Sequence, residues 1–287
     1  MLLVETVDVI TPIVDDPYTF GAICASNSVS DIYAMGGKPI TALAILGFDS
    51  CDFGPEVIKD ILRGAVDKLR EAGTCLIGGH SIEDKEFKLG FAVTGTVEKN
   101  SILKAGGASA GDILILTKPL GTGILTSAVK LGKMRKAGLK EVIASMLQLN
   151  KTSSRAAVLA GANAATDVTG FGLLGHALNI AKGSGVDARI FFRSIPFMKR
   201  MLNFISAGVV PKGARKNLDF CSADVRFHDG LSDVEKLALA DPQTSGGLLI
   251  ALPEKGRKKF DTLMKRAKHP YWIIGELEKG KGRIKIL

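Results

Sequence analysis

The sequence predicts an α+β protein built from two domains, and three observations support this. Strand and helix patterns alternate through the first third of the chain. A Gly/Ala/Ser-rich connector at residues 105–111 then interrupts them. The remainder mixes strands and helices without the strict strand–helix–strand rhythm of a doubly wound fold. We place the domains at residues 1–108 and 109–287, and 46% hydrophobic residues in 287 are enough for two cores.

The first domain should open with a strand followed by a helix. Residues 3–12 are rich in β-branched side chains, which is typical of a strand. Asp16-Pro17 forms the pattern of an N-cap and a first helical residue, and Gly36-Gly37 would end that helix.

The rest of this domain holds one long amphipathic helix and three strands. Residues 55–72 carry apolar side chains at helical spacing, and Gly73 would stop the helix. The strands are predicted at residues 40–48, 74–77 and 87–97.

The second domain should begin with a strand at residues 112–117 and contain mainly helices up to residue 240. The predicted elements are helices at about 123–136, 139–149 and 153–160, a helix after a Gly-rich loop, a strand at 188–192, helices at 197–207 and 233–240, a strand at 248–252, a helix at 258–268, and strands at 271–277 and 283–287.

Composition excludes several classes of protein. The formal net charge is +9, yet the Lys and Arg residues are scattered over amphipathic helices and the C-terminal third, without a basic arm or interleaved aromatic residues. We therefore expect no nucleic-acid partner, although the charge suits a polyanionic small molecule such as a nucleotide. No apolar run approaches the roughly 20 residues that span a bilayer, and no signal peptide opens the sequence, so we expect no membrane association.

The four cysteines form no CxxC pair, which argues against structural zinc and a disulfide framework and favours the reducing cytoplasm. We expect Cys24 and Cys75 in the core, and Cys51 and Cys221 in loops.

The segment NSVSDIYAMGG, residues 27–37, places a carboxylate near the C-terminal end of the first predicted helix. The helix dipole disfavours negative charge there by roughly 0.3–1 kcal/mol, and the apolar neighbours of Asp31 add a desolvation cost. A bound cation would offset both costs, and Asn27 lies one turn earlier on the same face. Asp31 is therefore a candidate metal ligand, and the alternative is an exposed or helix-capping aspartate.

Two further segments of the first domain combine polar residues with strands. Asp8 is a carboxylate inside an apolar strand. Gly78-Gly79-His80-Ser81 follows a predicted strand, where glycines would let the backbone approach a phosphate and His80 and Ser81 would donate hydrogen bonds. A tight turn is the alternative.

The segment TDVTGFGLLGH, residues 166–176, contains the G-x-G-x-x-G pattern of dinucleotide-binding proteins. We reject that match because residues 161–166 make a poor strand and Asp187 precedes its strand instead of ending one. A loop that leads into a helix, with Asp167 placed to hold a cation near bound phosphates, fits better. His176 is expected to be a packed core histidine. The segment DPQTSGG, residues 241–247, predicts only a turn, and no Walker A sequence occurs.

Taken together, NSVSDIYAMGG, GGHS, TDVTGFGLLGH and DPQTSGG, in this order, closely resemble the selenophosphate synthetase (selenide, water dikinase) family over essentially the whole chain. The resemblance implies the two-domain fold shared with aminoimidazole ribonucleotide synthetase, thiamine-monophosphate kinase and HypE. In that fold the N-terminal sheet pairs with a second copy into a barrel at a homodimer interface, and the C-terminal domain is α/β. ATP and several Mg²⁺ ions lie between the domains.

The resemblance also implies roles for individual residues. Asp8 and Asp31 would contact ATP through metal, and Asp167 would be a further Mg²⁺ ligand. Gly79, His80 and Ser81 would form part of the nucleotide site, within one chain or across the dimer. The implied reaction converts ATP, selenide and water to selenophosphate, AMP and orthophosphate.

The sequence departs from the family before the strand at residues 3–12. Members carry there a Gly-rich segment with a nucleophilic Cys or selenocysteine, a Lys and an Asp-Asp-Ala motif, and none of these is found here. We therefore expect a catalytic core without its nucleophile, which binds nucleotide poorly and does not complete the reaction. A selenocysteine UGA codon read as a stop when the gene was annotated, with the reading frame restarted at Met1, would explain the difference, as would a truncation.

Two other functions stay open on the sequence. One is another ATP-dependent kinase or synthetase of the same superfamily, and the other is a non-catalytic, dimeric nucleotide-binding protein.

Overall fold

The computed structural model describes residues 1–287, which form two compact units. The first unit contains Met1–Ile102 and the short segment Met146–Lys151, and the second contains Leu103–Ser145 and Thr152–Leu287. The division after Ile102 precedes the connector at residues 105–111, which lies in the second unit. No helix is both long and apolar enough to cross a bilayer.

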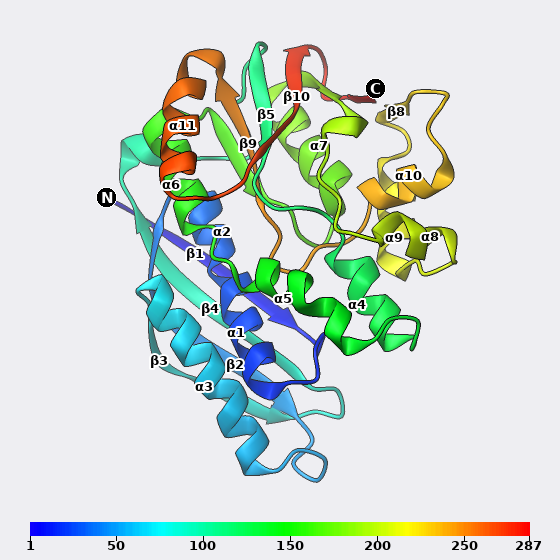
Figure 1. Ribbon diagram of the computed structural model, residues 1–287. Helices are drawn as coiled ribbons and strands as arrows, with labels where there is room; N and C mark the ends of the chain where they lie inside the picture. The colour runs from blue at the N-terminus through cyan, green and yellow to red at the C-terminus, as the bar shows by residue number, and fades with distance from the viewer. The chain divides into compact units, whose positions relative to one another are not determined.

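The first unit is a four-stranded sheet with helices on one face (Figure 1). Its elements are β1 (Leu2–Ile10), α1 (Pro17–Ser28), α2 (Ser30–Ala34), β2 (Lys38–Phe48), α3 (Pro55–Ala72), β3 (Cys75–Glu83), β4 (Lys88–Val97) and the 3₁₀ turn η1 (Lys99–Ser101). The strand order β1-β4-β2-β3 leaves β1 and β3 as the two edges.

The helices cover this sheet because alternate residues of its strands are apolar on that face. Phe91 and Val93 of β4 are buried there together with Phe20 of α1. Helix α1 also packs closely on α3, since a Cβ added at Gly21 would lie 1.8 Å from the carbonyl oxygen of Ile61. Only glycine fits at that contact.

Two sequence predictions for this unit were wrong. The chain does not form one helix from Pro17 to the Gly36-Gly37 stop, because it divides at Val29 into α1 and the five-residue α2. Asp31 therefore lies in the first turn of α2 and not at the C-terminal end of a long helix, so the macrodipole argument for a bound cation does not hold.

The second error concerns the segment Gly78-Gly79-His80-Ser81, which does not follow a strand but lies inside β3. Pairing with β2 passes from Ala42–Leu76 to Leu43–Gly78, so Ile77 is an extra residue, as in a β-bulge. Gly79 has φ 157°, and a Cβ there would lie 2.3 Å from the carbonyl oxygen of Ala44. The glycines therefore permit close strand pairing.

The second unit is a seven-stranded mixed sheet with helices on both faces. Its strands are β5 (Asp112–Leu116), β6 (Ala164–Asp167), β7 (Val186–Ile190), β8 (Val225–Phe227), β9 (Leu248–Pro253), β10 (Trp272–Lys279) and β11 (Ile284–Ile286). Its helices are α4 (Thr122–Lys130), α5 (Lys140–Leu147), α6 (Lys151–Ala160), α7 (Gly172–Ser184), α8 (Met201–Ser206), α9 (Lys212–Cys221), α10 (Asp233–Leu239) and α11 (Glu254–Arg266), with 3₁₀ turns η2 (Lys136–Leu139) and η3 (Phe192–Ser194).

The strand order β6-β9-β5-β10-β7-β11-β8 places β9 and β10 antiparallel to their neighbours. Leu249 and Ala251 of β9 join the core that α7 covers, and α11 packs on β9 as well. Strand β6 was dismissed in the sequence as a poor strand, but it pairs with β9. It is not adjacent to β7 in the sheet, so the neighbouring βαβ unit of a dinucleotide fold is absent. Helix α9 and strand β8 were not predicted.

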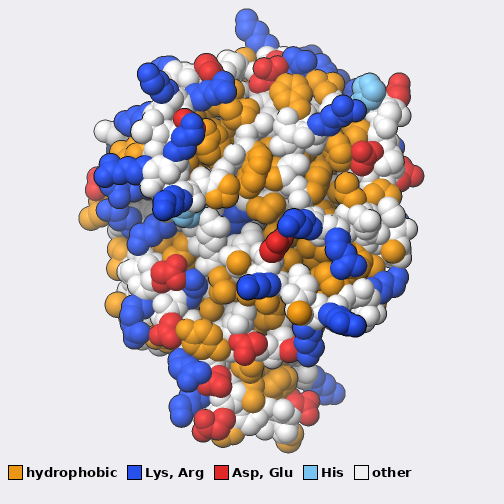
Figure 2. Space-filling model, in the orientation of Figure 1, with side chains coloured by type: hydrophobic (Ala, Val, Ile, Leu, Met, Phe, Trp, Pro, Cys, Tyr) orange, Lys and Arg blue, Asp and Glu red, His pale blue; other side chains and the backbone are white.

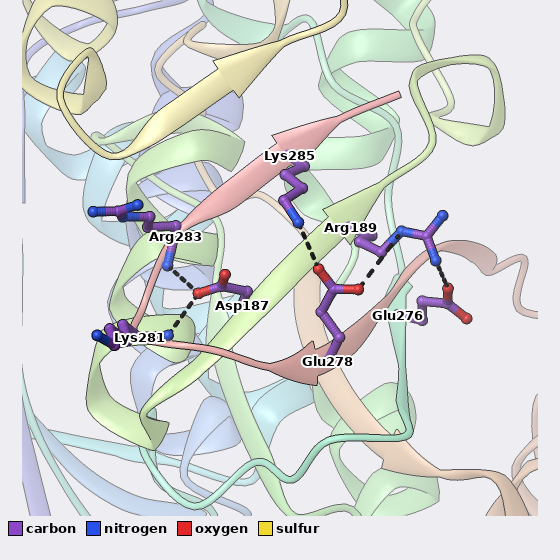
Figure 3. A network of polar contacts seen from close by, with 7 residues as sticks. All are labelled: Asp187, Arg189, Glu276, Glu278, Lys281, Arg283 and Lys285. Carbon is purple, nitrogen blue, oxygen red and sulfur yellow. Dashed lines mark hydrogen bonds and ion pairs between the residues drawn. The ribbon is translucent and has the colours of Figure 1, made fainter.

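On β10, β7 and β11, charged side chains lie on the face opposite to the core that α7 covers (Figure 3). Arg189 of β7 contacts Glu276 at 2.8 Å, and Lys285 of β11 contacts Glu278 at 2.9 Å. Asp187 accepts hydrogen bonds from the backbone amides of Lys281 and Arg283, so this carboxylate holds the turn between β10 and β11. Asp187 thus has a structural partner, and it is not placed to bind a ribose.

The cysteines differ in part from expectation. Cys24 is buried as predicted and Cys51 is exposed. Cys75 is exposed because it begins the edge strand β3, and Cys221 is buried at the last turn of α9. All four are free.

Candidate functional site

Two carboxylates meet in the first unit, one from β1 and one from α2. Asp8 and Asp31 are both half-buried. Burial, the nearby charge of Asp31 and a hydrogen bond between the two groups, in that order of size, together raise the pKa of Asp8 to about 6. The hydroxyl of Thr6 donates to Oδ2 of Asp31 at 2.6 Å, and the Ser28 hydroxyl donates to the backbone oxygen of Asp8 at 3.4 Å. Holding these two carboxylates side by side therefore costs folding free energy.

This pair suits a hard divalent cation. Carboxylate oxygens are the ligands that Mg²⁺ prefers, and Mg²⁺ commonly keeps several waters and binds through one or two carboxylates plus substrate phosphates. A cation between the groups would also relieve their repulsion. The chain contains no group of three or more His, Cys, Asp or Glu residues arranged to hold a metal, so these two carboxylates alone do not complete the coordination of an ion.

The structure does not bring Gly79, His80 or Ser81 to this pair within one chain. Asp8 lies in register with Phe91, Ala44 and Gly79 across the sheet, on the face that the helices cover. Asp8 is on one edge strand and Gly79 on the other, so three strand spacings of about 4.8 Å separate them. His80 lies in the adjacent row, on the opposite face.

Asp167 lies in the second unit at the end of β6, and its side chain is buried. The loop that follows is tied down along its backbone. Val168 donates to the oxygen of Gly247, and Gln243 donates through its backbone amide to the oxygen of Thr169. Asn217 donates to the oxygen of Gly170 at 2.8 Å. The segments around Asp167 and around Gln243, both singled out in the sequence, thus form one structure.

His176 is buried in α7, as predicted for a packed histidine. Its ring contacts the same loop, because the backbone amide of Thr169 donates to Nε2 at 3.0 Å.

Residues 241–247 do more than form the turn that was predicted for them. The side-chain oxygen of Gln243 accepts from the amides of Gly121 and Thr122 and so caps α4, which has no capping side chain of its own. Buried Lys118 donates to the oxygen of Ser245 at 2.7 Å, and Ser245 has a left-handed φ of 47°. Two sequence features could have indicated this role. Helix α4 has no local N-cap residue, and the polar residues 241–247 directly precede the apolar strand β9.

Asp241 is also buried here, and burial raises its pKa from 3.8 to about 7, against hydrogen bonds from Gln243, Ile124 and Gly123. The folded state therefore keeps a proton that the unfolded chain loses above about pH 4, and stability falls as the pH rises from there to about 7. We expect wild type to lose about 2–3 kcal/mol more than Asp241→Asn between about pH 5 and pH 8.

Urea denaturation of both proteins at the two pH values measures this difference. Exposed Asp229→Asn is the matched control and should follow wild type. Parallel pH dependences of wild type and Asp241→Asn would show that Asp241 is ionised in the folded protein.

The basic residues show no single patch on the face drawn in Figure 2. Lysine and arginine side chains are spread over that surface, with acidic side chains between them.

Comparison with known protein families matches both parts of the chain. Residues 1–97 match the family described as AIR synthase related protein, N-terminal domain, and residues 109–286 match AIR synthase related protein, C-terminal domain.

Curated relatives resemble the chain at the level of sequence. A selenide, water dikinase of Geobacter metallireducens is 45% identical over 260 residues, which cover 91% of this chain and 76% of the relative. One of Nitratidesulfovibrio vulgaris is 42% identical over 282 residues, which cover 98% of this chain and 80% of the relative.

Solved structures share the fold at low identity. Thiamine-monophosphate kinase from Stenotrophomonas maltophilia has a TM-score of 0.77 and 21% identity, covering 99% of this chain and 85% of that one. The hydrogenase maturation protein HypE in complex with ATP has a TM-score of 0.74 and 16% identity, covering 100% of this chain and 82% of that one. These likenesses confirm the predicted two-domain architecture.

Proposed function

Because the chain belongs to the selenide, water dikinase family, we propose that it serves the conversion of ATP, selenide and water to selenophosphate, AMP and orthophosphate. The observation that supports this most directly is the Asp8–Asp31 pair, whose repulsion a bound cation would relieve. Free cysteines, two of them exposed, also suit a reducing cytoplasm.

In this proposal Asp8 and Asp31 hold Mg²⁺ with the phosphates of ATP, and Asp167 is a further Mg²⁺ ligand. Bound Mg²⁺ would neutralise the negative charge that develops on the phosphate oxygens during phosphoryl transfer. The chain's own residues prepare for this. Thr6 fixes one oxygen of Asp31 through its hydroxyl. The hydrogen bonds of the backbone around residues 168–170 restrict the loop that follows Asp167.

We further propose a homodimer through the uncovered face of the first sheet. Single side chains on that face are widely exposed, for example Val7 at 60% and Leu43 at 46%. The apolar members are Leu3, Val7, Val9, Leu43, Ile45 and Ile82. A contiguous apolar face of this kind is uncommon on a monomer. A second copy of the chain has the same apolar face, and the two faces would cover each other in a dimer.

This dimer would also complete the nucleotide site. Edge strands β1 and β3 each carry nine residues with one unpaired side. Closing two such sheets into a barrel sets β1 of one copy beside β3 of the other. Asp8 on β1 of one copy and Gly79 and Ser81 on β3 of the second copy would then lie on neighbouring strands.

Product analysis tests the proposed reaction. Selenophosphate in phosphorus NMR, with AMP and orthophosphate in chromatography, after incubation with Mg²⁺, ATP and selenide would support the proposed reaction and overturn the expectation that a chain without the nucleophile does not complete it. ADP as the product would favour another kinase or synthetase of the superfamily. Tight Mg²⁺–ATP binding without any turnover would favour the non-catalytic nucleotide-binding protein.

A further inference from the structure

One buried imidazole contacts the chain on both sides of Asp167, the last residue of β6. His176 projects from α7, and only 6% of it is exposed. Its Nε2 accepts from the backbone amide of Thr169 at 3.0 Å and lies 3.3 Å from the hydroxyl oxygen of the same residue. Its Nδ1 lies 3.4 Å from the hydroxyl oxygen of Thr166. The same hydroxyl donates to the backbone oxygen of Asp167 at 3.1 Å. The ring therefore contacts the residues before and after the aspartate.

The contact between Nε2 and a backbone amide favours one tautomer of the ring. A backbone amide can only donate, so Nε2 must be an acceptor and a neutral imidazole must carry its proton on Nδ1. Nδ1–H then donates to the hydroxyl oxygen of Thr166, and that hydroxyl donates to the backbone oxygen of Asp167. A ring of the other tautomer would leave the amide of Thr169 without this acceptor, and burial makes that loss costly.

We propose that His176 is a positioning residue for Asp167, acting through the acceptor Nε2 on the amide of Thr169. The inference rests on the proposed role of Asp167 as a Mg²⁺ ligand. Groups that orient metal-binding carboxylates typically affect metal affinity by about 10–100-fold. His176 acts on Asp167 indirectly, through the backbone, so we expect its effect on metal affinity to lie near the lower end of this range, at about tenfold.

The tautomer can be observed directly. In protein labelled with ¹⁵N-histidine, four imidazoles are present, and the one whose signals vanish in His176→Gln is assigned. Its nitrogen shifts should show a bare Nε2 and a protonated Nδ1. A proton on Nε2 would overturn the proposal in the wild-type protein, whatever the variants do.

Variants then separate positioning from packing. Asparagine can reach the place of Nδ1 but not of Nε2, whereas glutamine can place an amide oxygen near the position of Nε2. His176→Asn should weaken Mg²⁺-dependent ATP binding about tenfold in calorimetry, and His176→Gln should stay within about threefold of wild type. His228→Asn is the matched control, because Nδ1 of exposed His228 also accepts a backbone amide, that of Gly230 at 3.1 Å, and it should bind like wild type.

Asp167→Asn separates this inference from the proposed function. If Asp167→Asn binds Mg²⁺–ATP like wild type, or wild type does not bind it, the metal role of Asp167 is wrong and the inference is overturned with it. If Asp167→Asn is weak but His176→Asn is normal, only the inference is overturned. Equal losses in folded His176→Asn and His176→Gln would also overturn it. Should His176→Asn not fold, a tenfold loss of Mg²⁺–ATP affinity in His176→Gln would also overturn the inference.

Discussion

Replacing Asp31 by asparagine should weaken binding of Mg²⁺–ATP by on the order of a hundredfold. The amide keeps the size of the carboxyl group, and its oxygen can still accept from Thr6, so the local structure should persist. What disappears is one negative charge of the pair, and with it a hard anionic ligand. Calorimetric titration of ATP in the presence of Mg²⁺ measures the change.

Asp52→Asn is the matched control, because Asp52 is exposed in the same unit and lies in the loop before α3. It should bind as wild type does. ATP titrated without Mg²⁺ should distinguish the two proteins much less, since the loss is in metal ligation. Equal Mg²⁺–ATP affinities of Asp31→Asn and wild type would refute the assignment of the metal site.

The sequence identified Asp8 and Asp31 for reasons that are partly correct. Each is a carboxylate among apolar neighbours, and the structure places both at half-buried positions close together. The helix-end argument failed because the break at Val29 has no glycine or proline to mark it. The family resemblance selected the same residues independently, through the motif order.

Other parts of the site depend on partners distant in sequence. Gln243 and the amide of Gly121 are 122 positions apart, and no local pattern predicts that one caps the helix after the other. Strand β6 is four residues long and rich in alanine, and it becomes a strand only by pairing with β9. In contrast, α3 was predicted at its observed bounds because amphipathic spacing and Gly73 are both local signals.

Replacing Leu43 by glutamate should convert the proposed homodimer into monomers. In the single chain Leu43 is already 46% exposed, so the monomer should tolerate the change with little loss of stability. In a closed barrel two unpaired carboxylates would be buried, at a cost of several kcal/mol. Sedimentation equilibrium of wild type and Leu43→Glu at equal concentrations measures the shift.

The same variant tests whether the nucleotide site spans two copies. Leu43 shares its row with Val7 and Ala92, on the face opposite to Asp8, so the substitution leaves the carboxylate pair intact. Mg²⁺–ATP binding should nevertheless weaken, because separated monomers lose the second copy's Gly79 and Ser81 from the site. Leu131→Glu, at a 62% exposed leucine of the second unit, is the matched control and should change neither property. Monomers that still bind Mg²⁺–ATP like wild type would confine the site to one chain, and an unchanged dimer would mean that copies associate through a different surface.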